Sequence, residues 1–241
     1  MLAIHNGYLF NQSMSKKSLP ECFVNIKDLQ LFDRSDSMCP CRMIGFQGGK
    51  KTFSNISSSY YLVVLSGEVS VSYKALKFDN LPKLAFVACP GEISVSGKGM
   101  AIVIEKFGYR APFQLGVIEE TRGRLCYIDN ASSSLLVSPA RMGDPCLNLL
   151  TFPSGVIQRS HIHPTVRLGA VIWGSGECLW GEEKRKIPLT PGMTFCLPEA
   201  QVHSFNSGKD GLGVVAFHPD SDVGPTDLSH PMLSRTYLIK K

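Results

Sequence analysis

Short apolar segments separated by turn residues are the feature that most limits what this chain can fold into. These segments are rich in β-branched and aromatic residues, and Gly, Pro or Ser interrupts them. They span residues 60–73, 83–109, 167–180, 193–205 and 212–219. This pattern is typical of a β-sandwich or barrel. We find no long segment of helical periodicity; residues 25–33 are the best short candidate, and they also fit a strand.

Composition supports one large β domain or two small ones. The chain has 241 residues, 44% of them apolar and 19% charged, which suits a globular protein with a real core. Its net charge of +5 comes from short basic clusters without interleaved aromatic residues. We therefore expect no nucleic-acid partner.

No apolar run reaches the roughly 18–20 residues that a membrane helix needs, so we expect no membrane association. The first residues lack a basic segment ahead of their apolar part and do not resemble a signal peptide. Eight cysteines are scattered, several of them in apolar contexts. A reduced, cytoplasmic protein is the expectation.

The chain also shows an internal repeat. Residues 63–71 resemble 170–180, each an apolar strand, a small-residue turn and a second strand. Residues 88–97 resemble 189–200 in the same way, and the order is the same in both halves. With a join near residues 118–134, we predict one β unit at 1–125 and a second at 126–241.

Two histidines stand one residue apart in the second half, within a run ending in Trp-Gly. On a strand, His161 and His163 would point to the same face. Imidazole nitrogens suit iron, zinc, copper and nickel. Arg167 follows closely, although a cation site would more naturally have a carboxylate there, because arginine has only donors.

The spacing around these histidines resembles the first motif of the cupin superfamily. That motif runs Gly, five residues, His-x-His, three or four residues, Glu, six residues, Gly. Here Gly155, His161, His163 and Gly174 fit, and Arg167 replaces the Glu.

The second cupin motif follows in the expected order. It runs Gly, five residues, Pro-x-Gly, two residues, His, three residues, Asn. Gly192, Pro198 and His203 fit, whereas Ala200 replaces the Gly and Asn206 falls one residue early. The resemblance covers about residues 145–220.

The first half fits the same template without its ligands. Gly48 and Gly67 are spaced as Gly155 and Gly174 are. Gly91 and Gly99 fall in place for the second motif. The ligand positions would then hold Ser54, Ile56, Tyr60 and Ile102, so we predict a degenerate N-terminal unit that cannot bind metal in the family's way.

The resemblance implies an all-β protein built from two double-stranded β-helix barrels of the jelly-roll type in tandem. It implies a divalent metal ion on His161, His163 and His203. Fe(II) is favoured, because cupins that lack the Glu include iron dioxygenases; Zn, Mn or Ni would also suit the ligands.

Arg167 has two interpretations. It either enters the cavity and holds a substrate carboxylate, or it points away and pairs with an acidic residue such as Glu177 or Glu199. Gln158, Thr165 and Trp173 are further cavity candidates. His218 ends a predicted strand near the barrel mouth, where it either has a structural role or contacts substrate.

Three functions follow as hypotheses. The leading one is a three-histidine Fe(II) dioxygenase acting on a small carboxylate-bearing molecule, with Arg167 on the carboxylate. The alternatives are a metal-assisted isomerase or lyase on a small sugar or keto acid, and a non-enzymatic ligand-binding bicupin. Cupins commonly pair their sheets, so we expect a homodimer.

Overall fold

The structure, a computed structural model, describes residues 22–230, 232–233, 236–237 and 239. Nearly all of its regular structure is antiparallel sheet, arranged in two sheets of eight and six strands. The remaining element is the short 3-10 helix η1 (Ile128–Asn130). No helix in these residues has the length and apolarity needed to cross a membrane.

The C-terminal sheet carries the motif residues. Its strands run in the order β1 (Phe23–Asn25), β13 (Met193–Leu197), β11 (Arg167–Trp180), β14 (His203–His218), β10 (Cys146–Phe152), β9 (Ser132–Val137) and β8 (Leu125–Cys126), with β12 (Arg185–Leu189) paired to β11.

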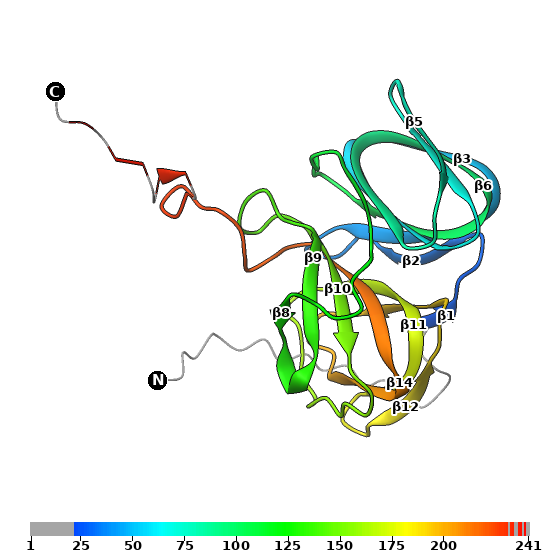
Figure 1. The fold of residues 1–241 in the computed structure, drawn as a ribbon, viewed down its shortest axis with the longest axis vertical. Coiled ribbons are helices and arrows are strands. Elements are labelled where there is room, and N and C mark those ends of the chain that lie inside the picture. The colour runs from blue at the N-terminus through cyan, green and yellow to red at the C-terminus, as the bar shows by residue number, and fades with distance from the viewer. Residues whose placement is uncertain (1–21, 231, 234–235, 238, 240–241) are drawn as a thin grey trace.

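The N-terminal sheet is dominated by two very long strands. Its order is β2 (Gln30–Arg34), β3 (Cys41–Ser66), β6 (Ala85–Lys106), β4 (Val69–Tyr73) and β5 (Leu76–Leu81), with β7 (Gln114–Val117) paired to β6. β3 and β6 curl around each other, so that Tyr60 pairs with both Glu105 and Cys89. The ring-shaped ribbon of these strands is plain in Figure 1.

The predicted strands are confirmed, with two refinements. Residues 193–205 are not one strand, because β13 ends at Leu197 and β14 begins at His203. The ambiguous segment 25–33 contributes a strand, β2, and no helix.

Strands at the centre of the molecule bury both faces, and alternate residues enter different cores. In β3, Tyr60 packs inside the N-terminal sheet, whereas Tyr61 faces the other sheet. We call the shared cluster the inter-sheet core. It includes Met43, Tyr61, Ile102, Leu147, Leu149, Leu168, Ala170, Val215 and Phe217. The rings of Tyr61 and Phe217 lie 4.8 Å apart across it.

The pairing of β1 bears on how the halves are joined. Phe23–Asn25 hydrogen-bonds with β13, so this early segment completes the C-terminal sheet. The predicted division at residues 125/126 stays a prediction, and residues 1–21 of its first unit lie outside the described part of the chain.

The strand register contradicts one predicted match between the halves. His161 pairs with His203, and the predicted counterpart of His161, Ser54, pairs with Glu92. Ile102 was the predicted counterpart of His203, but it lies in the inter-sheet core. The sequence comparison matched the two halves residue by residue with a fixed difference in numbering. In the second half residues 198–202 separate β13 from β14, whereas β6 is continuous, so the matching residues are shifted.

Two matched glycines show why the turns recur. Gly67 and Gly174 have positive φ values of 66° and 72°. A Cβ on Gly67 would lie 2.7 Å from the Cα of Gly99, and one on Gly174 would lie 2.2 Å from the Gly211 carbonyl oxygen. A side chain is therefore excluded at both positions by the neighbouring backbone as well as by φ.

Replacing Gly174 with Ala should destabilise the protein more than replacing Gly155 with Ala. Both glycines have φ of 72°, so both variants incur a left-handed backbone cost of about 1–2 kcal/mol. A Cβ on Gly155 meets no atom within 4 Å, and only Gly174→Ala adds a backbone clash. Urea denaturation of the two variants measures the difference; equal losses of stability would contradict this packing.

Candidate metal centre

Three histidines converge at one end of the C-terminal sheet. One ligand-capable atom from each of His161, His163 and His203 lies within 4.8 Å of the others. Their ring centroids are 4.5–5.1 Å apart. Ile162, between the first two, is 56% exposed and points away. The predicted convergence of the H-x-H pair is therefore present, although only His161 lies in a β-bridge.

The backbone holds two of these residues face to face. The amide of His161 donates to the carbonyl of His203 at 2.9 Å, and the amide of His203 donates back at 3.0 Å. His161 Nδ1 lies 3.0 Å from the carbonyl oxygen of Arg159, and His203 Nδ1 lies 2.9 Å from that of Gln201. A carbonyl only accepts, so each Nδ1 carries the proton and Nε2 is the free ligand atom.

Ala200 ties the second motif to the first. Its amide donates to the carbonyl of His163 at 2.8 Å. Its φ is 57°, a left-handed value at the position where the cupin motif has Gly. The departure from the motif is thus accommodated without a change of backbone conformation, at a cost of about 1–2 kcal/mol.

The histidines line a cavity of about 70 Å³ inside the C-terminal sheet. Leu150, Phe152, Phe195, Leu197, Phe205 and Ala216 form much of its wall. The inward residues alternate with those of the inter-sheet core: Asn148 and Leu150 face the cavity, whereas Leu147 and Leu149 face the other sheet. The small volume suits a ligand of few heavy atoms.

Arg167 lines this cavity and also lies near a carboxylate, so it combines parts of both interpretations. It is 6% exposed, and its Nη1 donates to the carbonyls of Thr165 and Val166 at 3.1 Å. The closest carboxylate is Asp220, at 3.8 Å. The alternative partners, Glu177 and Glu199, pair instead with Lys186 and Arg34.

Of the other predicted cavity residues, one lines the cavity, one forms hydrogen bonds with Arg167 and Asp220, and one lies elsewhere. Gln158 lines the cavity, and its side-chain oxygen accepts from the amide of Phe205 at 3.0 Å. The Thr165 hydroxyl accepts from Arg167 and donates to Asp220. Trp173 packs against the inter-sheet core and does not line the cavity.

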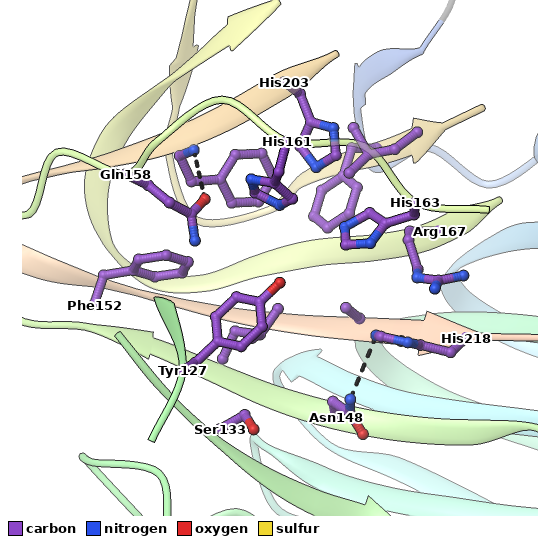
Figure 2. A pocket seen from close by; sticks show the side chains of 15 residues that line it. Tyr127, Ser133, Asn148, Phe152, Gln158, His161, His163, Arg167, His203 and His218 are labelled. Atoms are coloured by element: carbon purple, nitrogen blue, oxygen red, sulfur yellow. Dashed lines mark hydrogen bonds between the residues drawn. The ribbon is translucent and has the colours of Figure 1, made fainter. Parts of the chain in front are cut away.

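His218 lines the cavity opposite the metal-ligand candidates (Figure 2). Its ring centroid lies 6.4 Å from that of His163. Burial, with Arg167 and His163 nearby, holds its pKa well below the usual range, so the ring is neutral.

Three polar residues of the cavity escaped the sequence analysis, namely Tyr127, Ser133 and Asn148. Tyr127 comes from the segment before η1, and its hydroxyl points toward the histidines in Figure 2. No motif marks it. Asn148 is an amide within the apolar strand β10, a signal that could have been noticed; its inward face follows only from the strand register.

Burial keeps two of the metal-ligand candidates, His163 and His203, neutral. It lowers the pKa of His163 to about 3, assisted by Arg167 and the other two histidines. Burial likewise lowers the pKa of His203 to about 4, against the opposing effect of the hydrogen bond that His203 donates to the Gln201 carbonyl. These two neutral imidazoles fit a divalent cation, because their protonation does not compete with metal binding near neutral pH.

The fold can be compared with known structures. No family model matches the sequence, and no curated protein sequence is significantly similar to it. A cupin 2 conserved barrel domain protein from Leptotrichia buccalis aligns with a TM-score of 0.59 at 12% identity, over 85% of this chain and 90% of that one. This chain has the cupin fold.

Two cupin-fold enzymes are among the similar structures. Salicylate 1,2-dioxygenase from Pseudaminobacter salicylatoxidans aligns with a TM-score of 0.56 at 11% identity, over 78% of this chain and 75% of that one. Oxalate decarboxylase from Bacillus subtilis, whose structure concerns Mn(II) centres, gives 0.54 at 11%, over 87% and 79%. These similarities show the fold of this chain, and its reaction has to be inferred from its own residues.

The metal-free protein should lose stability as the pH falls from about 7 to about 5. His163 and His203 remain neutral in the fold, whereas unfolded histidines protonate near 6.5, so the unfolded chain binds more protons in that range. Their unfavourable contribution is absent above about pH 7 and grows on acidification.

A His163→Asn variant removes one of these groups and should show a weaker pH dependence. Urea denaturation in the presence of a chelator, at about pH 7 and about pH 5, measures the free energies of unfolding. An equally steep loss in wild type and variant would contradict a buried, neutral His163.

Proposed function

We propose that this cupin is a metal-dependent enzyme of the three-histidine type, most simply an Fe(II) dioxygenase acting on a small carboxylate-bearing molecule. The observation that carries the proposal is one small cavity holding three convergent imidazoles and a buried arginine. A bound divalent cation would supply Lewis-acid or redox chemistry at its open positions.

His161, His163 and His203 would hold the ion through neutral nitrogens. For His161 and His203, the carbonyls of Arg159 and Gln201 fix the ring tautomer that leaves Nε2 available. The set is compatible with Fe(II), and with Zn, Mn or Ni.

Arg167 would bind the carboxylate of the substrate. A permanent cation near a divalent ion is unfavourable unless an anion lies between them, and a substrate carboxylate meets that need. The Arg167 Nε is buried without a hydrogen-bond partner among the described residues. It is therefore available as a donor to a ligand.

Tyr127 and the apolar walls complete the environment. Burial raises the pKa of the Tyr127 phenol, so its hydroxyl stays protonated and can donate a hydrogen bond to a ligand atom. The phenylalanine and leucine side chains exclude water from the cavity and strengthen the electrostatic interactions within it.

The wider expectations are carried forward as proposals. We propose a tandem arrangement of two cupin units, which the matched turns at Gly67 and Gly174 support. We also propose a homodimer in the cytoplasm with a small anionic substrate and no nucleic-acid partner.

Oxygen uptake tests the reaction class. The protein would be loaded anaerobically with Fe(II) and exposed to oxygen with a panel of small carboxylates. The proposal expects substrate-dependent uptake. Turnover with Zn(II) or Mn(II) and no oxygen uptake with Fe(II) would contradict the dioxygenase and favour the isomerase or lyase.

Arg167→Met should weaken carboxylate binding about 10- to 100-fold and leave the bound metal in place, since it removes a charge-assisted hydrogen bond but no metal ligand. Isothermal titration with propionate measures the effect. Arg124→Met, at an exposed arginine outside the cavity, is the control. Unchanged affinity in Arg167→Met would contradict the role of Arg167.

A further inference from the structure

One end of the cavity holds two buried polar atoms that lack hydrogen-bond partners among the described residues. They are Nε of Arg167 and Oδ1 of Asn148. Buried polar atoms in native proteins nearly always have a partner. Both side chains line the cavity that contains the three histidines and also a neighbouring space beneath residues 220–223, so a ligand at this shared wall can supply the missing partners.

Asn148 is a polar position on an otherwise apolar inward face of β10. Leu150 and Phe152 follow it on that face. The opposing strand β14 contributes Ala216 and His218. Burying an amide without a hydrogen bond destabilises a protein. Asn148 is therefore better explained by an interaction with a ligand than by packing.

His218 provides a hydrogen-bond partner for the amide nitrogen of Asn148. Nδ2 of Asn148 lies 3.4 Å from Nε2 of His218, and the dashed line in Figure 2 marks this contact. Because an amide nitrogen only donates, Nε2 of His218 is the acceptor in this contact. Oδ1 of Asn148 is then left as an acceptor with no donor.

We propose that Asn148 determines substrate specificity by accepting a hydrogen bond from a hydroxyl or amino group of the ligand. This inference rests on the proposed function, in which Arg167 holds the ligand carboxylate. Because the cavity is only about 70 Å³, few atoms fit between the two contacts. The substrate class is therefore a small 2-hydroxy or 2-amino carboxylate.

A neighbouring cavity constrains how the idea can be tested. Asn148, Arg167 and His218 also line a space of about 180 Å³ beneath residues 220–223. These three side chains thus form a shared wall, and truncating Asn148 could join the two spaces. Asn148→Leu removes both polar atoms and keeps the wall filled, with Asn148→Ala as a second variant.

The experiment is a binding titration with lactate, propionate and pyruvate. These probes differ only in the substituent next to the carboxylate. Metal-free protein is used first, because the lactate hydroxyl then has no metal to bind. Wild type should bind lactate about tenfold more tightly than propionate, as expected for one buried hydrogen bond.

Asn148→Leu should bind lactate and propionate equally, with its affinity for propionate unchanged. The control Arg124→Met, at an exposed arginine outside the cavity, should keep the preference for lactate. If circular dichroism shows that Asn148→Leu does not fold, Asn148→Ala replaces it and should also bind lactate and propionate equally.

Three results would overturn the proposal. They are equal affinities for lactate and propionate in wild type, a lactate preference that survives in both Asn148 variants, and a preference for pyruvate over lactate. Failure of the proposed function looks different: the protein binds no metal, or Arg167→Met binds propionate as wild type does. If the protein binds no metal, the preference for lactate over propionate can still be measured, because that titration uses metal-free protein.

Discussion

The strands that build the cavity are buried on both faces, and the alternation of their side chains governs the rest of the structure. In β10 and β14, one set of residues enters the inter-sheet core and the other lines the cavity, and in β11 Leu168 enters that core whereas Arg167 lines the cavity. A slip of one residue in any of these strands would exchange the two sets. Arg167 would then face the apolar interface and Leu168 the metal-ligand candidates.

The contact between the sheets therefore supports the site as well as the fold. Phe217 packs on Tyr61 of the other sheet, while its neighbours Ala216 and His218 face the cavity. The ion pair between Arg34 and Glu199 joins the sheets beside the second motif. Such packing fixes the backbone from which the cavity side chains project, and it leaves Arg167 and Asn148 ready for a ligand.

Much of the site could be predicted because the relevant spacing is local. The H-x-H pair and His203 lie at motif positions, and the bridge between His161 and His203 brings them together as expected. For Arg167 the spacing left two interpretations, and its side chain lines the cavity. Ala200 adopts the glycine conformation of the second motif despite its side chain.

The remaining features depend on register and on long-range pairing. Asp220 lies near Arg167 only because the chain after β14 returns past it, so sequence pattern offered Glu177 and Glu199 instead. Tyr127 reaches the cavity from outside either motif. The match of Ile102 to His203 was wrong for the same reason. A fixed difference in residue number cannot account for residues 198–202, which separate β13 from β14 and have no equivalent in the continuous strand β6.

The central claim is that His161, His163 and His203 bind one divalent ion. Elemental analysis of protein purified without added metal tests it most directly, comparing wild type with His203→Ala and with the control His230→Ala, whose histidine is exposed far from the motif residues in sequence. The account predicts about one ion per chain in wild type and control, and almost none in His203→Ala. Absence of metal from all three proteins, or equal metal in all three, would contradict it.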